Sequence, residues 1–240
     1  MQEVVIEVLR LDGGTLRIRH AAEMAQVFFR LDPSANGPKS YDACVARSPK
    51  DRIVAEDIKA INTTMAAHAR LHWWQALIDQ AEPAWLTSLD PSWSLFDLTD
   101  DSWASLGIEA SIANTFSVMF GYGRRLSVVT KVLHMKRPDL IPVCDALVLQ
   151  QVGAPAGIDD DPAKAAAFIA HLRKEGRCNL PGLRVIQDHL QMEGRTPSLL
   201  RIFEALIWQS HPSVWYQKLA PLIAEWLDEK PAEAQQHREP

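Results

Sequence analysis

A single carboxylate, Asp145, stands between two apolar runs in the stretch LIPVCDALVL. Residues 140–144 are apolar on one side, and residues 146–149 are apolar on the other. Burying a carboxylate without a partner costs several kcal/mol, which is comparable to the net stability of a whole domain. We therefore expect Asp145 to be exposed, to cap the start of a helix, or to be held in place for chemistry.

A run of basic residues lies just before this carboxylate. The stretch GYGRRLSVVTKVLHMKR, residues 121–137, contains no acidic residue, although the whole chain carries a net charge of -5. That charge excludes a protein coated with nucleic acid over its whole surface, but a local cationic face can still bind phosphate. The alternative is a solvated face that supports the ends of helices. The basic residues are Arg124, Arg125, Lys131, Lys136 and Arg137.

The same stretch begins with two glycines, Gly121 and Gly123. Glycines permit a tight turn with free N–H groups, and the positive end of a following helix adds attraction for an anion such as phosphate. Arg124 and Arg125 would reinforce this site. Two prolines then turn the chain back and place Asp145 at the start of the next helix, where an aspartate caps free N–H groups.

The other reactive side chains do not form a second site in the sequence. The three cysteines are widely spaced and lack a C-x-x-C motif, which argues against disulfides, a zinc site and an iron–sulfur cluster. The apolar neighbours of Cys144 would raise its pKa, so we expect a buried thiol. The histidines His134, His171, His189 and His211 are spread over different predicted helices, and no pair of them has the i, i+4 spacing with a carboxylate that a helical metal site needs. Most of the eight tryptophans are set among core residues. We predict no metal and no cofactor.

The elements that must position Asp145 are mostly helical. Alternating residues on both sides of Asp12-Gly13-Gly14 predict a small β-hairpin, and a helical pattern spans residues 21–31. A loop rich in Pro, Gly and Ser follows at DPSANGPKSYD, and beyond it the apolar spacing is helical. The predicted helix starts are Asp161-Pro162 and Thr196-Pro197, and the predicted helix ends are Gly176 and Gly194.

These patterns predict a mainly α-helical fold with a small N-terminal β-hairpin. Residues 1–50 hold the hairpin, a helix and a loop, residues 51–229 form a helical domain, and residues 230–240 form a disordered tail. No apolar stretch reaches the roughly 18 to 20 residues that cross a bilayer, and the N-terminus lacks the pattern of a signal peptide. We expect a soluble, cytoplasmic protein without a membrane partner.

The stretch from Phe120 to Gly153 resembles a known family. Its Gly-rich turn, its helix containing KVLH, its proline-containing loop and its apolar run ending in PVCD are similar to the helix-hairpin-helix base-excision DNA glycosylases, the endonuclease III and adenine glycosylase group. The stretch KVLHMKRPDLIPVCDALV also resembles an uncharacterised bacterial family. The first resemblance implies a glycosylase-like helical bundle with DNA as its partner.

This resemblance implies a role for each part of the stretch. In the resembled enzymes the hairpin N–H groups grip DNA phosphate, the damaged nucleotide is flipped into a pocket, and an aspartate supports the sugar as the glycosidic bond breaks. Asp145 would be this catalytic carboxylate. The lysine nucleophile of bifunctional members falls on Ser127, so a hydrolytic glycosylase is the closer analogue. The implied phosphate contacts are Gly121, Gly123, Arg124, Arg125, Ser127, Lys131, Lys136 and Arg137.

Departures from the family pattern keep other functions open. Aligned from Asp145, the second hairpin glycine falls on Arg125, and no four-cysteine cluster follows Cys178. A non-catalytic DNA-binding module of the same fold explains these departures as well as an enzyme does. A structural or interaction protein, in which Asp145 is only a helix cap, is the third alternative.

Overall fold

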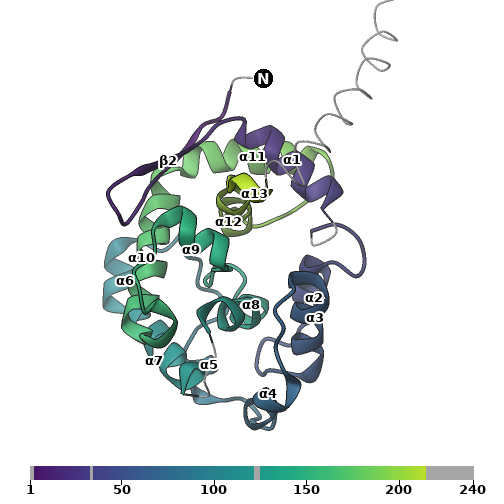
Figure 1. Cartoon of the computed structure of the whole chain (residues 1–240), viewed down its shortest axis with the longest axis vertical. Helices are drawn as coiled ribbons and strands as arrows, with labels where there is room; N and C mark the ends of the chain where they lie inside the picture. Colours follow the sequence, from purple (N-terminus) through teal and green to yellow (C-terminus); the bar gives the residue numbers. More distant parts are fainter. Residues whose placement is uncertain (1–2, 33–34, 122–124, 215–240) are drawn as a thin grey trace, which may run out of the picture.

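The computed structural model describes residues 3–32, 35–121 and 125–214. Over these residues the protein is mainly helical and carries a two-stranded antiparallel hairpin, as the sequence predicts (Figure 1). No helix in these ranges is both long enough and apolar enough to span a membrane. The elements are β1 (Ile6–Leu9), β2 (Thr15–Ile18), α1 (Ala21–Leu31), α2 (Tyr41–Arg47), α3 (Ala55–Met65), α4 (Leu71–Ile78), α5 (Ala84–Thr87), α6 (Asp100–Ser105), α7 (Ile108–Phe120), α8 (Leu126–Lys136), α9 (Ala146–Val152), the 3-10 helix η1 (Ile158–Asp160), α10 (Pro162–Cys178), α11 (Leu180–Met192), α12 (Leu199–Gln209) and α13 (Pro212–Val214).

The hairpin is held against α10 by side chains that complete its free edge. β1 pairs with β2, and Gly13 adopts a φ of 87° in the turn. The outer edge of β1 would otherwise present unpaired N–H and C=O groups. Asn179 accepts a hydrogen bond from the Glu7 N–H and donates one to the Glu7 carbonyl, while Glu175 accepts from the Leu9 N–H at 2.7 Å. The hairpin is therefore tied to the helical body.

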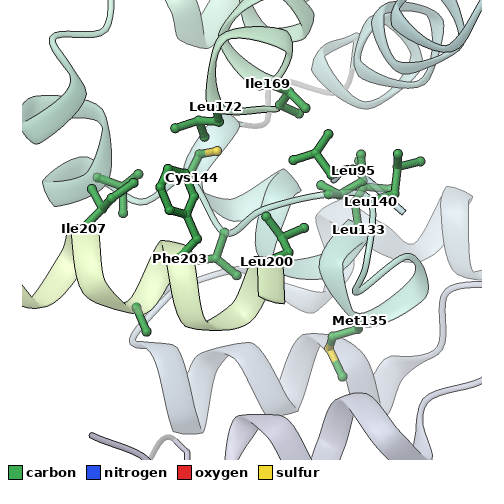
Figure 2. Packing of buried hydrophobic residues seen from close by; sticks show 14 of the residues in the cluster. Leu95, Leu133, Met135, Leu140, Cys144, Ile169, Leu172, Leu200, Phe203 and Ile207 are labelled. Carbon is green, nitrogen blue, oxygen red and sulfur yellow. The ribbon is translucent and has the colours of Figure 1, made fainter. Parts of the chain in front are cut away.

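The N-terminal and C-terminal helices pack together around the segment that precedes Asp145. α1 lies against α11 and α12, and α9 also lies against α12 (Figure 1). Residues 140–144 are buried, and Figure 2 shows Cys144 beside Leu172 of α10 and Phe203 of α12. The apolar run is thus a core segment, and it leads directly to Asp145 at the start of α9.

Helix α8 lies at the centre of the fold. It packs against α2, α3, α7 and η1, and residues 129–136 are all buried. A helix that is covered on every side has no solvated face. The second half of the basic stretch therefore lies inside the protein, which determines what its cations can contact.

Two helix boundaries differ from the sequence expectation, and two agree with it. The predicted end at Gly194 is confirmed, since α11 ends at Met192 and Gly194 has a φ of 77°. Gly176 lies inside α10 and does not end it. Packing explains the glycine, because a Cβ at this position would be 2.1 Å from Cε1 of Phe96. Helix α12 begins after Ser198, whose hydroxyl is the N-cap, instead of after Thr196. The Asp161 cap of α10 is confirmed, since its carboxylate accepts hydrogen bonds from two N–H groups of the first turn.

The tryptophans of the described residues lie mostly in or against the core, as expected. Trp74, Trp85 and Trp103 are buried. Trp73 is the exception, because it is 49% exposed and the Arg70 guanidinium lies 5.1 Å from its ring centroid. The last two tryptophans and the predicted disordered tail lie outside the described residues.

Candidate functional site

Asp145 is the N-cap of α9, as one reading of the sequence predicts. Its Oδ1 atom accepts hydrogen bonds from the N–H groups of Leu147 and Val148, both at 3.0 Å. The side chain is half-buried. Its second oxygen, Oδ2, has no hydrogen-bond partner among the residues that the structure describes. The carboxylate is therefore held in a fixed orientation while one oxygen is left uncommitted.

The predicted phosphate site at the start of α8 is partly occupied by the protein itself. Gly121 is an exposed residue at the end of α7, Arg125 is exposed at the N-cap of α8, and Ser127 is half-buried. Gly123 and Arg124 lie outside the described residues. The first N–H group of α8, at Leu126, donates to Oδ1 of Asp159 at 3.0 Å. A carboxylate of the chain thus takes one of the amide groups expected to bind phosphate.

Lys136 is a correction to the predicted phosphate contacts. Its side chain is fully buried, and its ammonium group donates to Oγ of Ser48 at 2.7 Å, to the carbonyl of Pro49 at 2.9 Å and to Oδ2 of Asp57. An ammonium group has three N–H bonds, and all three are used here. Asp57 also accepts from the Val54 N–H, so Lys136 belongs to a closed structural network.

Arg137 is a second correction, because its guanidinium ties together chain segments inside the protein. Its Nε donates to the carbonyl of Leu89, and its Nη2 donates to the carbonyl of Leu86 at 2.8 Å. Its Nη1 donates to the carbonyls of Lys50 and Lys136 at 2.7 and 2.9 Å. All three nitrogens are engaged by backbone oxygens and the residue is buried, so this guanidinium is not available to a phosphate at the surface.

Lys131 is also buried, but it lies near Asp145. Its ammonium group donates to the carbonyl of Met65 at 3.0 Å. Burial lowers the pKa of Lys131, and the negative charge of Asp145 acts in the opposite direction. Of the predicted contacts that the structure describes, only Gly121, Arg125 and Ser127 are left accessible.

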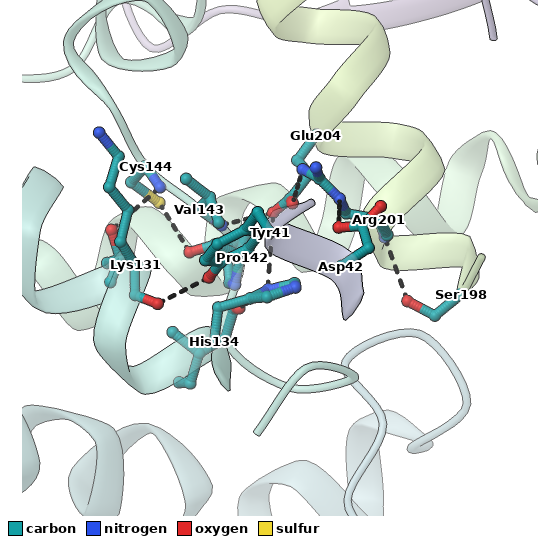
Figure 3. Close-up of polar contacts among 12 residues, drawn as sticks. Tyr41, Asp42, Lys131, His134, Pro142, Val143, Cys144, Ser198, Arg201 and Glu204 are labelled. Carbon is teal, nitrogen blue, oxygen red and sulfur yellow. Dashed lines mark hydrogen bonds and ion pairs between the residues drawn. The ribbon is translucent and has the colours of Figure 1, made fainter. Parts of the chain in front are cut away.

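A second buried polar network, which sequence reasoning missed, joins α2, α8 and α12 (Figure 3). Arg201 donates through Nε to Oδ1 of Asp42 at 2.9 Å and through Nη1 to Oε1 of Glu204 at 2.8 Å. Glu204 also accepts from the Val143 N–H. Nδ1 of His134 lies 3.9 Å from Oε2 of Glu204. Two carboxylates therefore share one guanidinium beside an imidazole.

The charges in this network shift one another's pKa values. Burial alone would lower the pKa of Arg201, but the carboxylates of Asp42 and Glu204 raise it above its ordinary value, so the guanidinium stays charged. Burial raises the pKa of both carboxyl groups, against the opposing effect of Arg201. Burial and the positive charge of Arg201 lower the pKa of His134 to about 4. His134 is accordingly neutral at pH 7.

The tautomer of His134 follows from its neighbour. Nδ1 lies 2.8 Å from the carbonyl oxygen of Ile141. A carbonyl oxygen can only accept, so in the neutral ring the proton is on Nδ1 and Nε2 carries a lone pair. Nε2 has no hydrogen-bond partner in the described parts of the chain. The ring thus offers a free acceptor.

This network borders a cavity of about 630 Å³. Volumes of roughly 300 to 1,000 Å³ are typical of small-molecule sites. Apolar wall residues come from α1, α2 and the loops before α9 and α12, and they are mixed with polar and charged groups. The polar and charged lining residues are Asn36, Ser40, Asp42, Lys50, His134, Asp139, Arg195, Thr196, Ser198 and Arg201.

The described residues also bear on the metal and thiol expectations. No group of three or more His, Cys, Asp or Glu side chains is arranged there to hold a metal ion. Cys144 is fully buried, and burial raises the pKa of its thiol well above the ordinary value. A thiol of this kind is a core residue and a poor nucleophile.

Comparisons with known proteins place the chain in a family. No curated protein and no solved structure gives a significant match. One family model matches residues 21–211, which include every helix described above from α1 to α12. Both the half-buried Asp145 and the Arg201 network lie within the matched region. The chain therefore belongs to the family described as Family of unknown function (DUF6308).

Proposed function

We propose that this protein acts on DNA as a hydrolytic glycosylase, with Asp145 as its catalytic carboxylate. One observation carries the proposal: a half-buried carboxylate is fixed through Oδ1 by two N–H groups while Oδ2 has no hydrogen-bond partner among the described residues. The buried ammonium of Lys131 is near enough to interact with it electrostatically. A fixed carboxylate with a free oxygen is what an emerging positive charge requires.

The reaction would use this carboxylate in the way that glycoside hydrolysis does. As the N-glycosidic bond breaks, positive charge develops on the ring oxygen and anomeric carbon of the sugar. The free oxygen of Asp145 would stabilise that charge and orient the attacking water. The nucleotide would have to leave the duplex to reach Asp145, because the reacting bond is inaccessible inside the stack.

A second candidate is a non-catalytic role in which Asp145 is only a helix cap. Two observations favour it: the α8 N–H at Leu126 already binds Asp159, and Lys136 and Arg137 are buried. A DNA-binding module of this kind would rely on Arg125 and its neighbours. A structural protein would not bind DNA at moderate salt.

The first experiment measures binding to a short duplex that contains an abasic-site analogue and to the undamaged duplex, each at two salt concentrations. Tighter, salt-sensitive binding to the abasic duplex supports a site for an extruded nucleotide. Equal binding to both duplexes favours the non-catalytic module. Absence of binding to either would refute both DNA roles.

The second experiment compares wild type with Asp145→Asn on duplexes that carry modified bases. Asparagine keeps a side-chain oxygen for the two N–H groups, so the fold and the DNA affinity should change little. Excision should fall by roughly 10²-fold or more, as when an electrostatic stabiliser is removed. Excision by Asp145→Asn at the wild-type rate would rule out the proposed mechanism. Asp145→Ala is the matched variant that also removes the cap.

A further inference from the structure

The lining of the cavity beside Arg201 has more cationic side chains than carboxylates among the described residues. Lys50 donates to the carbonyls of Val45 and Met135 at 2.8 and 2.6 Å, and it makes no ion pair within the described residues. The Arg195 side chain makes one hydrogen bond there, donating from Nη1 to Oδ1 of Asn36 at 3.3 Å. Both cations line the cavity. Neither is matched by a carboxylate at salt-bridge distance.

Arg201 adds a donor that the fold leaves unused. The side chain is 8% exposed, and its Nη2 is buried without a hydrogen-bond partner in the described residues. The guanidinium carbon lies 5.3 and 5.6 Å from the ring centroids of Phe28 and Tyr41, which cannot satisfy an N–H group as an oxygen can. Buried donors of this kind usually signal a missing partner, such as water or a ligand.

His134 adds the complementary group, an acceptor. It lines the same cavity, and its Nε2 lone pair is free because Nδ1 donates to Ile141. Arg201 and His134 lie on either side of Glu204, at 2.8 and 3.9 Å from its two oxygens. Donors and an acceptor are therefore gathered within one small region, against walls that include Phe29, Val45 and Pro197.

We propose that this cavity binds a small organic anion that carries a carboxylate or a phosphate group. Lys50 and Arg195 provide the charge for that group, and Arg201 provides a further donor beside them. The Nε2 atom of His134 receives an O–H or N–H group of the same molecule. Two carboxylates also line the cavity: Asp42 is paired with Arg201, and the exposed Asp139 makes no ion pair within the described residues. The three lining cations, Lys50, Arg195 and Arg201, outnumber these two carboxylates. The site is separate from Asp145 and does not depend on the proposed DNA activity.

The test measures the binding of inorganic phosphate, acetate and benzoate to the full chain at pH 7. Calorimetry gives the affinity, and the rise in melting temperature gives an independent measure of binding. Sodium chloride at matched ionic strength is the control for general salt effects. A carboxylate preference appears as benzoate or acetate binding without phosphate binding, and a phosphate preference appears as the reverse. Benzoate should bind more tightly than acetate, since its ring adds contacts with the apolar wall.

Two variants locate the binding site. Arg195→Ala removes a cation that makes only one hydrogen bond, and it should weaken the preferred anion by about tenfold or more, the loss of one charge-assisted contact. His134→Asn keeps an N–H donor for the Ile141 carbonyl and removes the Nε2 acceptor. Arg184→Ala, at an exposed arginine on α11, is the matched control and should bind like wild type.

The outcomes decide the proposal. Binding in wild type that falls in Arg195→Ala and stays unchanged in Arg184→Ala supports the site, and a change in the ¹⁵N shift of His134 Nε2 on binding places the anion beside it. Anions that act no differently from chloride overturn the proposal. Equal affinity in Arg195→Ala and Arg184→Ala overturns it as well. If His134→Asn does not fold, the arginine pair still decides.

Discussion

Two groups of buried cations in this protein are satisfied to different degrees. At the end of α8, Lys136 uses its three N–H bonds and Arg137 uses all three of its nitrogens, so every charged nitrogen of this group has a partner within the protein. On α12, Arg201 pairs with two carboxylates and still leaves Nη2 without a partner among the described residues. The first group is closed, whereas the second is incomplete and borders a cavity.

The difference teaches how to separate structural charges from candidate binding charges. Most of the oxygens around Lys136 and Arg137 are backbone carbonyls, which lock distant segments onto α8. Such a network is stable because every member is satisfied. Around Arg201 the partners are the side chains of Asp42, which lines a cavity, and the buried Glu204, and a donor of Arg201 and an acceptor of His134 have no partner within the described residues. A site that awaits a ligand is expected to look like this.

Breaking the closed group should have the largest effect on stability. Lys136→Met fills similar space but leaves the carboxylate of Asp57 buried without its ammonium partner. We expect the free energy of unfolding to fall by about 3 to 5 kcal/mol, as for other buried pairs that lose one member. Urea unfolding measures this change. Lys174→Met, at an exposed lysine of α10, is the control and should stay within about 0.5 kcal/mol of wild type.

A small cost for Lys136→Met would contradict the assignment of this group as structural. The double variant Lys136→Met with Asp57→Asn sharpens the test, because it removes the unpaired charge along with the cation. It should recover part of the lost stability. If the double variant is no more stable than Lys136→Met, the unpaired charge of Asp57 is not the cause of the lost stability.

The network around Arg201, which includes His134, should make the free energy of unfolding depend on pH. The unfolded chain takes up a proton near the ordinary pKa of 6.5, whereas the folded ring does so only at about pH 4. Between these values the unfolded state binds more protons, so stability falls as the pH falls, by up to about 1.4 kcal/mol per pH unit. Above pH 6.5 this contribution is fully present. Urea unfolding between pH 7 and pH 4 follows it.

The matched comparison for this pH effect is His134→Asn, which has no titrating ring. Asp42 and Glu204 face the imidazole region in both proteins, and their raised pKa values act in the opposite direction. Their contribution largely cancels in the difference between the two curves. The stability advantage of wild type should therefore shrink as the pH falls from 6.5. Parallel curves would show that His134 is not held neutral by burial.

Local sequence signals predicted the elements that depend on neighbouring residues. The hairpin, the Asp145 and Asp161 caps and most helices follow from turn residues, capping side chains and apolar spacing within a few positions. The Arg201 network could not be found in this way, because Asp42 and Arg201 are 159 residues apart and share no motif. Only the folded chain brings α2 and α12 together.

The basic stretch shows where local reasoning fails. Arg124, Lys131 and Lys136 appear in one short segment without acids, which favours a solvated cationic face. Helix α8 is instead surrounded by other helices, and its partners for Lys131 and Lys136 come from α3 and from the segment before it. The apolar spacing of α8 cannot identify one covered face, because other elements cover residues 129–136 on all sides of the helix. Charge in a sequence locates cations but not their partners.

The smallest predicted effect concerns Asp159. Its carboxylate accepts a hydrogen bond from the first N–H group of α8, at Leu126, as backbone carbonyls accept from Arg137. Asp159→Asn keeps an oxygen for the Leu126 N–H but loses the negative charge at the positive end of the helix, so we expect a loss of about 0.3 to 1 kcal/mol in unfolding experiments. Asp159→Ala removes the acceptor as well and should cost more. If α8 faces DNA with this end, both variants should bind undamaged duplex more tightly and with a steeper salt dependence, because an acid next to Arg125 is gone. Unchanged duplex binding together with the expected loss of stability would mean that this helix end serves only the fold.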